Sequence, residues 1–84
     1  MDKRFLSAQK LEITEHILYK KLADFTKEAK NKQTLNKIAA MELNHYNFFK
    51  EYTKQDIKPN LFKVKWYTFL AKIAGITFGV KLME

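Results

Sequence analysis

The chain has 84 residues, of which 46% are apolar and 14% aromatic, enough to pack the core of one small domain. It has no cysteine, which excludes disulfides, zinc ribbons, thiolate-ligated iron–sulfur clusters and a thiol nucleophile, and fits a reducing cytoplasm. The net charge of +7 comes from fifteen scattered lysines and a single arginine set against nine acids. Because readers of phosphates and bases usually carry arginine, this charge favours a solvated surface over a nucleic-acid partner.

Only two glycines and one proline interrupt the sequence, which favours long helices. We predict a first helix over residues 5–30. It ends near Asn31 and Thr34, the two candidate capping residues. We predict a second helix over residues 34–54.

A loop that contains the proline separates this second helix from the C-terminal segment, residues 61–84. The pattern of that segment is helical, with predicted interruptions at Gly75 and Gly79. The predicted fold is therefore all-α. It is a single domain over residues 1–84, with a long antiparallel helical hairpin over residues 5–55 followed by a C-terminal helical segment.

The first predicted helix places acidic residues on its apolar face. At 100° per residue, Glu12 lies among Ala8, Tyr19 and Leu22, and Glu15 lies one turn further along the same arc. A second apolar stripe faces roughly the other way and consists of Leu6, Ile13 and Ile17. A helix that is apolar on two sides must be covered on two sides. We therefore expect oligomerisation, and we expect a bent C-terminal segment to cover the side of Ile13 and Ile17.

The second predicted helix places Glu42 and His45 at adjacent positions of its apolar face. Their spacing lets an oxygen and a nitrogen meet one ion from a single helical turn. A carboxylate in a core face is costly unless it is protonated, paired or bound to a cation. No lysine or arginine lies on that arc of either helix near Glu12 or Glu42. The sequence thus predicts a metal site at Glu12, Glu42 and His45, whose ligand types suit iron or manganese and are compatible with zinc.

Several neighbouring residues have alternative interpretations. Glu15 is either a further metal ligand or an acceptor that supports one. His16 lies toward the flank of the arc and favours a surface or supporting role. Tyr19 is the candidate catalytic residue, as a donor to a ligand carboxylate or to an oxygen species at the metal, and otherwise is a core aromatic. The alternative for the whole cluster is a hydrogen-bonded core His45 with Glu42 at a subunit boundary.

Two segments resemble the metal-ligating helices of the rubrerythrin branch of the ferritin-like superfamily. They are residues 8–23, with Glu12 and Tyr19 seven residues apart, and residues 38–46, with Glu42-x-x-His45. The resemblance implies that Glu12, Glu42 and His45 ligate a non-haem di-iron centre. It also implies iron oxidation, or the reduction of peroxide or oxygen, as the associated chemistry.

The C-terminal segment from Pro59 to Glu84 is similar to a narrower group, the ferritin-like domains that precede vacuolar-iron-transporter-type membrane domains. In such proteins a further helix pair supplies the second ligand set, which Glu84 would open. The chain is then either a fragment of a longer protein or half of a homodimer. In the homodimer two copies complete a four-helix bundle with two irons. We favour the homodimer, because the two apolar faces demand a partner in any case.

A rival interpretation is a non-catalytic, iron-sensing or interaction module, whose partner would be a membrane-associated iron transporter. Residues 66–83 are mostly apolar, but Lys72 and Lys81 disfavour a membrane-spanning helix. Peripheral membrane contact is a secondary expectation for four residues of the same segment, Lys63, Lys65, Trp66 and Tyr67. The predicted location is therefore the cytoplasm, with a membrane-peripheral location as the alternative.

Overall fold

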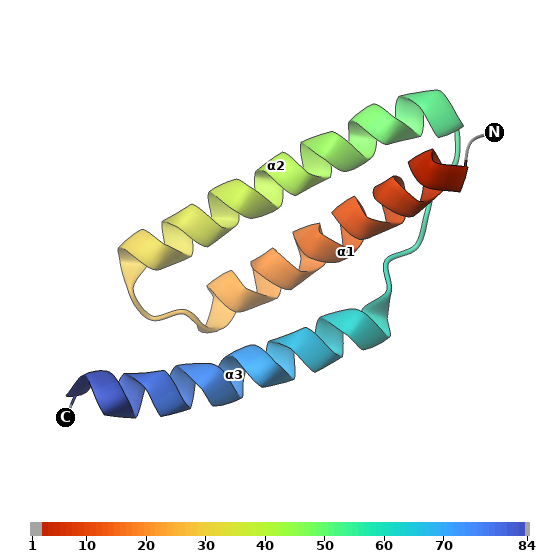
Figure 1. Cartoon of the computed structure of the whole chain (residues 1–84). Coiled ribbons are helices and arrows are strands. Elements are labelled where there is room, and N and C mark those ends of the chain that lie inside the picture. Colours follow the sequence, from red (N-terminus) through yellow and green to blue (C-terminus); the bar gives the residue numbers. More distant parts are fainter. Residues whose placement is uncertain (1–2, 84) are drawn as a thin grey trace.

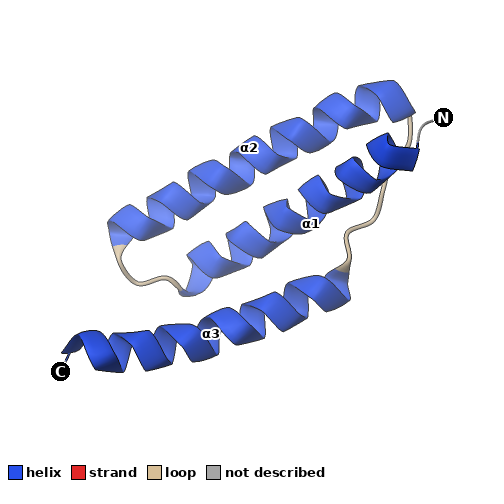
Figure 2. Ribbon diagram, viewed as in Figure 1, coloured by secondary structure: helices blue, strands red, loops and turns tan. Residues whose placement is uncertain are grey.

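The computed structural model describes the backbone of residues 3–83 and the side chains of residues 3–74. Three helices make up this part of the chain, with no strand among the described residues: α1 (Lys3–Phe25), α2 (Ala29–Thr53) and α3 (Leu61–Met83) (Figures 1 and 2). The predicted all-α class is therefore confirmed. The four-helix bundle formed by two copies stays a prediction.

Helix α1 lies between the other two helices (Figure 1). It packs antiparallel to α2 along its length and contacts α3 on its other side, while α2 and α3 do not contact each other in the described part of the chain. The molecule measures 53 × 23 × 15 Å along its principal axes. Three helices thus form a single layer, and much of the surface of α2 and α3 has no covering element.

The turn between α1 and α2 spans residues 26–28, about five residues earlier than predicted. The hydroxyl of Thr26 donates to the carbonyl oxygen of Leu22 at 2.5 Å, and the backbone N–H of Thr26 donates to Ala23 at 3.2 Å. Threonine side chains compete with the helical backbone in this way, so α1 stops here without a glycine or a proline. The predicted end of the first helix was wrong for this reason.

The two predicted capping residues lie inside α2. Thr34 donates its hydroxyl to the carbonyl oxygen of Lys30 at 3.1 Å, as threonines within helices often do. Asn31 donates its amide to the carboxylate of Glu28 at 3.1 Å, one turn earlier in the chain. Both side chains therefore bond within the first turns of α2, and neither begins the helix.

Helix α3 is continuous from Leu61 to Met83, so the predicted interruptions at Gly75 and Gly79 were wrong. A glycine within a helix costs roughly 1 kcal/mol but removes no backbone hydrogen bond, so the helix can continue through it. The predicted covering of Ile13 and Ile17 by this segment stays a prediction, although both isoleucines are half-buried. Among the described residues, no helix is both long and apolar enough to cross a bilayer.

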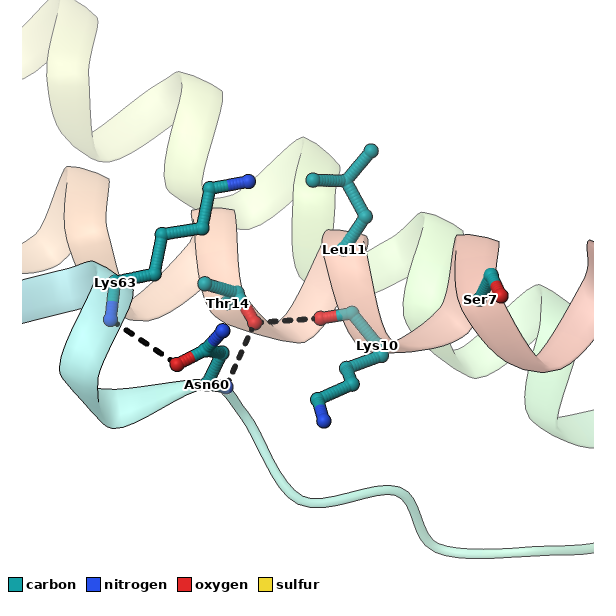
Figure 3. Close-up of a pocket in the computed structure, with 6 residues that line it drawn as sticks. All are labelled: Ser7, Lys10, Leu11, Thr14, Asn60 and Lys63. Atoms are coloured by element: carbon teal, nitrogen blue, oxygen red, sulfur yellow. Dashed lines mark hydrogen bonds between the residues drawn. The ribbon is translucent and has the colours of Figure 1, made fainter.

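The start of α3 is fastened to α1 through one asparagine (Figure 3). The side-chain oxygen of Asn60 accepts from the backbone N–H of Lys63 at 3.1 Å, which caps the helix. The backbone N–H of Asn60 donates to the hydroxyl oxygen of Thr14 on α1 at 3.0 Å. The shallow hollow in Figure 3 lies at this junction and is lined by Ser7, Lys10, Leu11, Thr14, Asn60 and Lys63. None of the predicted metal ligands lines it.

Small residues and a buried polar network hold α1 against α2. Ala23 and Ala39 are fully buried, which allows the two helices to approach closely. Gln9 is also fully buried; its amide donates to the carbonyl oxygen of Gln55 at 2.6 Å, and its oxygen accepts from the hydroxyl of Thr53 at 2.6 Å. Buried polar groups that are fully paired fix one arrangement of their elements. This network sets the register of α1 on α2 one turn before Glu12.

Candidate metal site

Glu12 on α1 converges with Glu42 and His45 on α2. One donor atom from each of the three residues lies within 4.8 Å of the others. The Nδ1 atom of His45 lies 3.2 Å from Oε2 of Glu12 and 3.9 Å from Oε1 of Glu42. The structure therefore brings together, from two helices, the three residues that the sequence predicts as metal ligands.

The three side chains differ in their exposure to solvent. Glu12 and Glu42 expose 17% and 15% of their side chains, whereas His45 exposes 52%. The two carboxylates, one from α1 and one from α2, are thus largely shielded, and the imidazole is the half-exposed member of the group. The site faces solvent on the side of His45.

The acidic groups of the site perturb one another. A hydrogen bond to the carboxyl group of Glu12 raises the pKa of Glu42 above its ordinary 4.5, and burial and repulsion from Glu12 raise it further. The hydrogen bond from Glu15 and the positive charge of His45 act in the opposite direction, but the pKa of Glu42 remains raised. The surroundings of Glu42 therefore disfavour its charged form, and a bound cation would offset that cost.

Glu15 joins this group through Glu42. Burial raises the pKa of Glu15 above 4.5, and the hydrogen bond to Glu42 and repulsion from it add to the rise. Glu15 is not one of the three residues whose donor atoms lie within 4.8 Å of one another. Its position fits a residue that supports Glu42 as well as it fits a further ligand, so both interpretations stay open.

Sequence reasoning missed one cation near the site. The charge of Lys63 lowers the pKa of Glu15, although burial and Glu42 outweigh it. Lys63 belongs to the first turn of α3, and not to either of the two helices that carry the predicted ligands. Only the packing of α3 on α1, fixed by Asn60 and Thr14, brings this lysine to the site.

His16 and Tyr19 lie on α1 beside the site. The Nδ1 atom of His16 lies 2.6 Å from the carbonyl oxygen of Ala39, so its N–H donates across the interface between α1 and α2. This contact agrees with a supporting role for His16 and leaves the ligand role to His45. Tyr19 is half-buried, and within the described part of the chain it has no hydrogen bond to Glu12, Glu42 or His45. Its catalytic role stays a prediction.

The three donors fit a transition-metal ion. At metal–ligand distances of about 2.1 Å, ligand atoms around one ion lie roughly 3 to 4 Å apart. The two distances from His45 fall in that range, and the group as a whole exceeds it by under an ångström. Two carboxylates and an imidazole suit iron or manganese and are compatible with zinc. Three protein donors also leave positions for a further ligand.

Comparison with protein-family models, with curated proteins and with solved structures finds no match to this chain. The resemblance to the rubrerythrin branch therefore stays a prediction from the residues. A function in metal binding is therefore inferred from the geometry of Glu12, Glu42 and His45. The further ligand proposed at Glu84 lies outside the described residues.

Proposed function

We propose that the chain binds iron at Glu12, Glu42 and His45, with Glu15 as an additional ligand. Two copies together hold two irons and use them in iron oxidation or in the reduction of peroxide or oxygen. The observation that carries this proposal is the convergence of two shielded carboxylates and an imidazole within 4.8 Å. The hydrogen bond with Glu12, burial and repulsion from Glu12 raise the pKa of Glu42, and this supports the proposal because a bound cation would stabilise the charged form.

The residues of the site have separate roles in this proposal. Glu12 and Glu42 hold the cation from opposite helices, and His45 fixes its position from the solvent-facing side. Iron, when bound, supplies the electrons for the reduction of oxygen or peroxide. Glu15 shares a hydrogen bond with Glu42 and can take up or release a proton there, beside the charge of Lys63. Tyr19, one turn after Glu15 on α1, is the proposed hydrogen-bond donor to a ligand carboxylate or to an oxygen species at the metal.

A second copy of the chain is the proposed partner because of the stripe that surrounds His45. We call the stripe of Met41, His45, Phe48 and Tyr52 on α2 the dimer stripe; its members recur every three or four residues and expose about half or more of their surface. Phe48 and Tyr52 pack edge to face, with ring centroids 5.4 Å apart. An apolar stripe at this spacing is typical of helix–helix interfaces. A copy related by a two-fold axis would cover the half-exposed ligand and bring the second ligand set.

Anaerobic titration with Fe(II) tests the proposal. We expect about one iron per chain in the wild type, and we expect the affinity of Glu42→Ala to fall by at least about 100-fold, because one of three close donors is removed. Glu51→Ala is the matched control, since Glu51 is an exposed acid on the same helix outside the donor cluster. Unchanged iron binding in Glu42→Ala, or an equal loss in Glu51→Ala, would contradict the proposal.

Admission of oxygen to the iron-loaded protein separates catalysis from sensing. The proposal predicts that wild-type protein accelerates the oxidation of Fe(II) over buffer and that Glu42→Ala does not. Tight binding of iron without acceleration would instead support the non-catalytic sensing module as the function. The metal site would then be correct and the proposed chemistry wrong.

A further inference from the structure

Over the part of α3 whose side chains are described, residues 61–74, the helix has two apolar faces, and only one of them is covered. Val64 is 99% buried against the rest of the molecule, where α3 packs on α1. The opposite side carries five exposed apolar residues, which we call the outer face: Phe62, Trp66, Phe69, Leu70 and Ile73. Phe62 alone exposes 80% of its surface. At 100° per residue these five side chains occupy an arc of about 100° opposite Val64.

The charges of α3 flank this outer face. On the same helical wheel Lys63 lies at one edge of the arc, and Lys65 and Lys72 lie beyond the other edge. Residues 57–83 contain no aspartate or glutamate. A tryptophan and phenylalanines between flanking lysines are typical of helices that lie in the interface of a membrane. There the lysine ammonium groups reach lipid phosphates while the rings enter the acyl boundary.

We propose that the outer face of α3 binds the surface of a membrane that contains anionic phospholipids, with α3 parallel to the membrane plane. The charge argues for this occupant over a second copy of the chain. Two copies that met through this face would bring together Lys63, Lys65 and Lys72 of both copies, and α3 itself has no aspartate or glutamate to pair them. An anionic surface instead complements these lysines and receives the exposed rings. Because α2 lies on the far side of α1, the metal site stays in solution.

Vesicle binding tests this inference. Vesicles of phosphatidylcholine with about 30% phosphatidylserine are expected to bind the protein at least tenfold more tightly than pure phosphatidylcholine, because each nearby lysine contributes to binding an anionic surface. Trp66 is the only tryptophan and reports on the contact directly. Its fluorescence should shift to the blue on binding and be quenched by brominated acyl chains. Absence of binding to the anionic vesicles would overturn the inference.

Two variants of the outer face sharpen the test. Phe62→Asp should reduce vesicle binding at least tenfold, because it places a charge in the acyl boundary. Its matched control, measured in metal-free buffer so that no metal-driven dimer contributes, is Phe48→Asp, which changes an exposed phenylalanine of α2 and should bind vesicles like the wild type. The double variant Lys65→Gln, Lys72→Gln should lose about as much affinity for anionic vesicles as Phe62→Asp does. Far-UV circular dichroism verifies that each variant is folded. Equal binding of Phe62→Asp and the wild type would overturn the inference.

Self-association through the same face is the competing outcome. Sedimentation velocity without lipid or metal compares the wild type with Phe62→Asp, and we expect the same association state for both. A wild-type dimer that dissociates in Phe62→Asp would assign the outer face to a second copy and overturn the inference. Glu42→Ala should bind vesicles like the wild type, because the metal site lies away from the outer face. The membrane inference and the proposed metal chemistry can therefore fail independently.

Discussion

Glu42→Gln is expected to make the metal-free protein more stable while it removes the binding of metal. Glutamine keeps the shape of the side chain and can still donate a hydrogen bond to Glu12, but it carries no charge, so the cost of burying a charge and the repulsion from Glu12 both disappear. We expect a gain in the free energy of unfolding on the order of 1 kcal/mol, equivalent to roughly 4–8 °C in melting temperature for a domain of this size. Thermal unfolding of metal-free protein at neutral pH measures this gain.

The gain in stability should depend on pH in a defined direction. The pKa of Glu42 is raised in the folded protein above its ordinary 4.5, so the folded state binds this proton more tightly than the unfolded chain does. Below about 4.5, Glu42 is protonated in both states, and wild type and Glu42→Gln should be similarly stable. As the pH rises from 4.5 through the raised pKa, the wild type loses stability relative to the variant.

Bound metal should make the wild type more stable than Glu42→Gln, the reverse of their order without metal. Mn(II) at 100 times its dissociation constant stabilises a folded protein by about 2.7 kcal/mol, and the wild type should show this gain while Glu42→Gln should not. Glu51→Gln serves as the control and should follow the wild type with and without metal. If Glu42→Gln is less stable than the wild type without metal at neutral pH, the charge of Glu42 does not destabilise the metal-free protein, and the prediction is wrong.

Metal is also expected to drive the formation of a dimer. If the two sites lie at one interface, each bound ion stabilises that interface, and binding of metal and of the second copy strengthen each other. We expect Mn(II) to lower the dissociation constant of the dimer by roughly 100-fold. Sedimentation velocity over a range of protein concentrations, with and without Mn(II), measures this change.

Variants of the dimer stripe identify the interface. Phe48→Asp places a charge on the stripe and His45→Ala removes the half-exposed ligand, so both should prevent the metal-driven dimer. Phe62→Asp on the outer face of α3 should leave it intact, which makes the two phenylalanine variants reciprocal controls for the two surfaces. A monomer that binds its full complement of metal would contradict the shared site.

The sequence predicted the helical hairpin and the convergence at the candidate site for simple physical reasons. Few helix-breaking residues leave long helices, and a period of 3.6 residues fixes which side chains share a face. Glu12, Glu42 and His45 each lie among apolar residues on such a face, so the packing of α1 on α2 brings them together. The place of His16 at the flank of the arc agrees with its hydrogen bond to the carbonyl oxygen of Ala39, beside the three converging residues.

Features that depend on contacts between distant residues could not be predicted in this way. Gln9 is a polar residue whose burial depends on Thr53 and on the loop after α2, more than forty positions away. Lys63 reaches Glu15 only because Asn60 fastens α3 to Thr14. The early end of α1 depends on one side-chain hydrogen bond of Thr26, which competes with the backbone in a segment without glycine or proline.

Anomalous diffraction from crystals grown with Mn(II) shows directly whether Glu12, Glu42 and His45 hold a metal ion. We predict an anomalous peak within about 2.5 Å of carboxylate oxygens of Glu12 and Glu42 and of a ring nitrogen of His45, with the same residues of a second copy beside a second peak. A structure in which these oxygens face solvent or bond only to protein groups, with no peak between them, would contradict it.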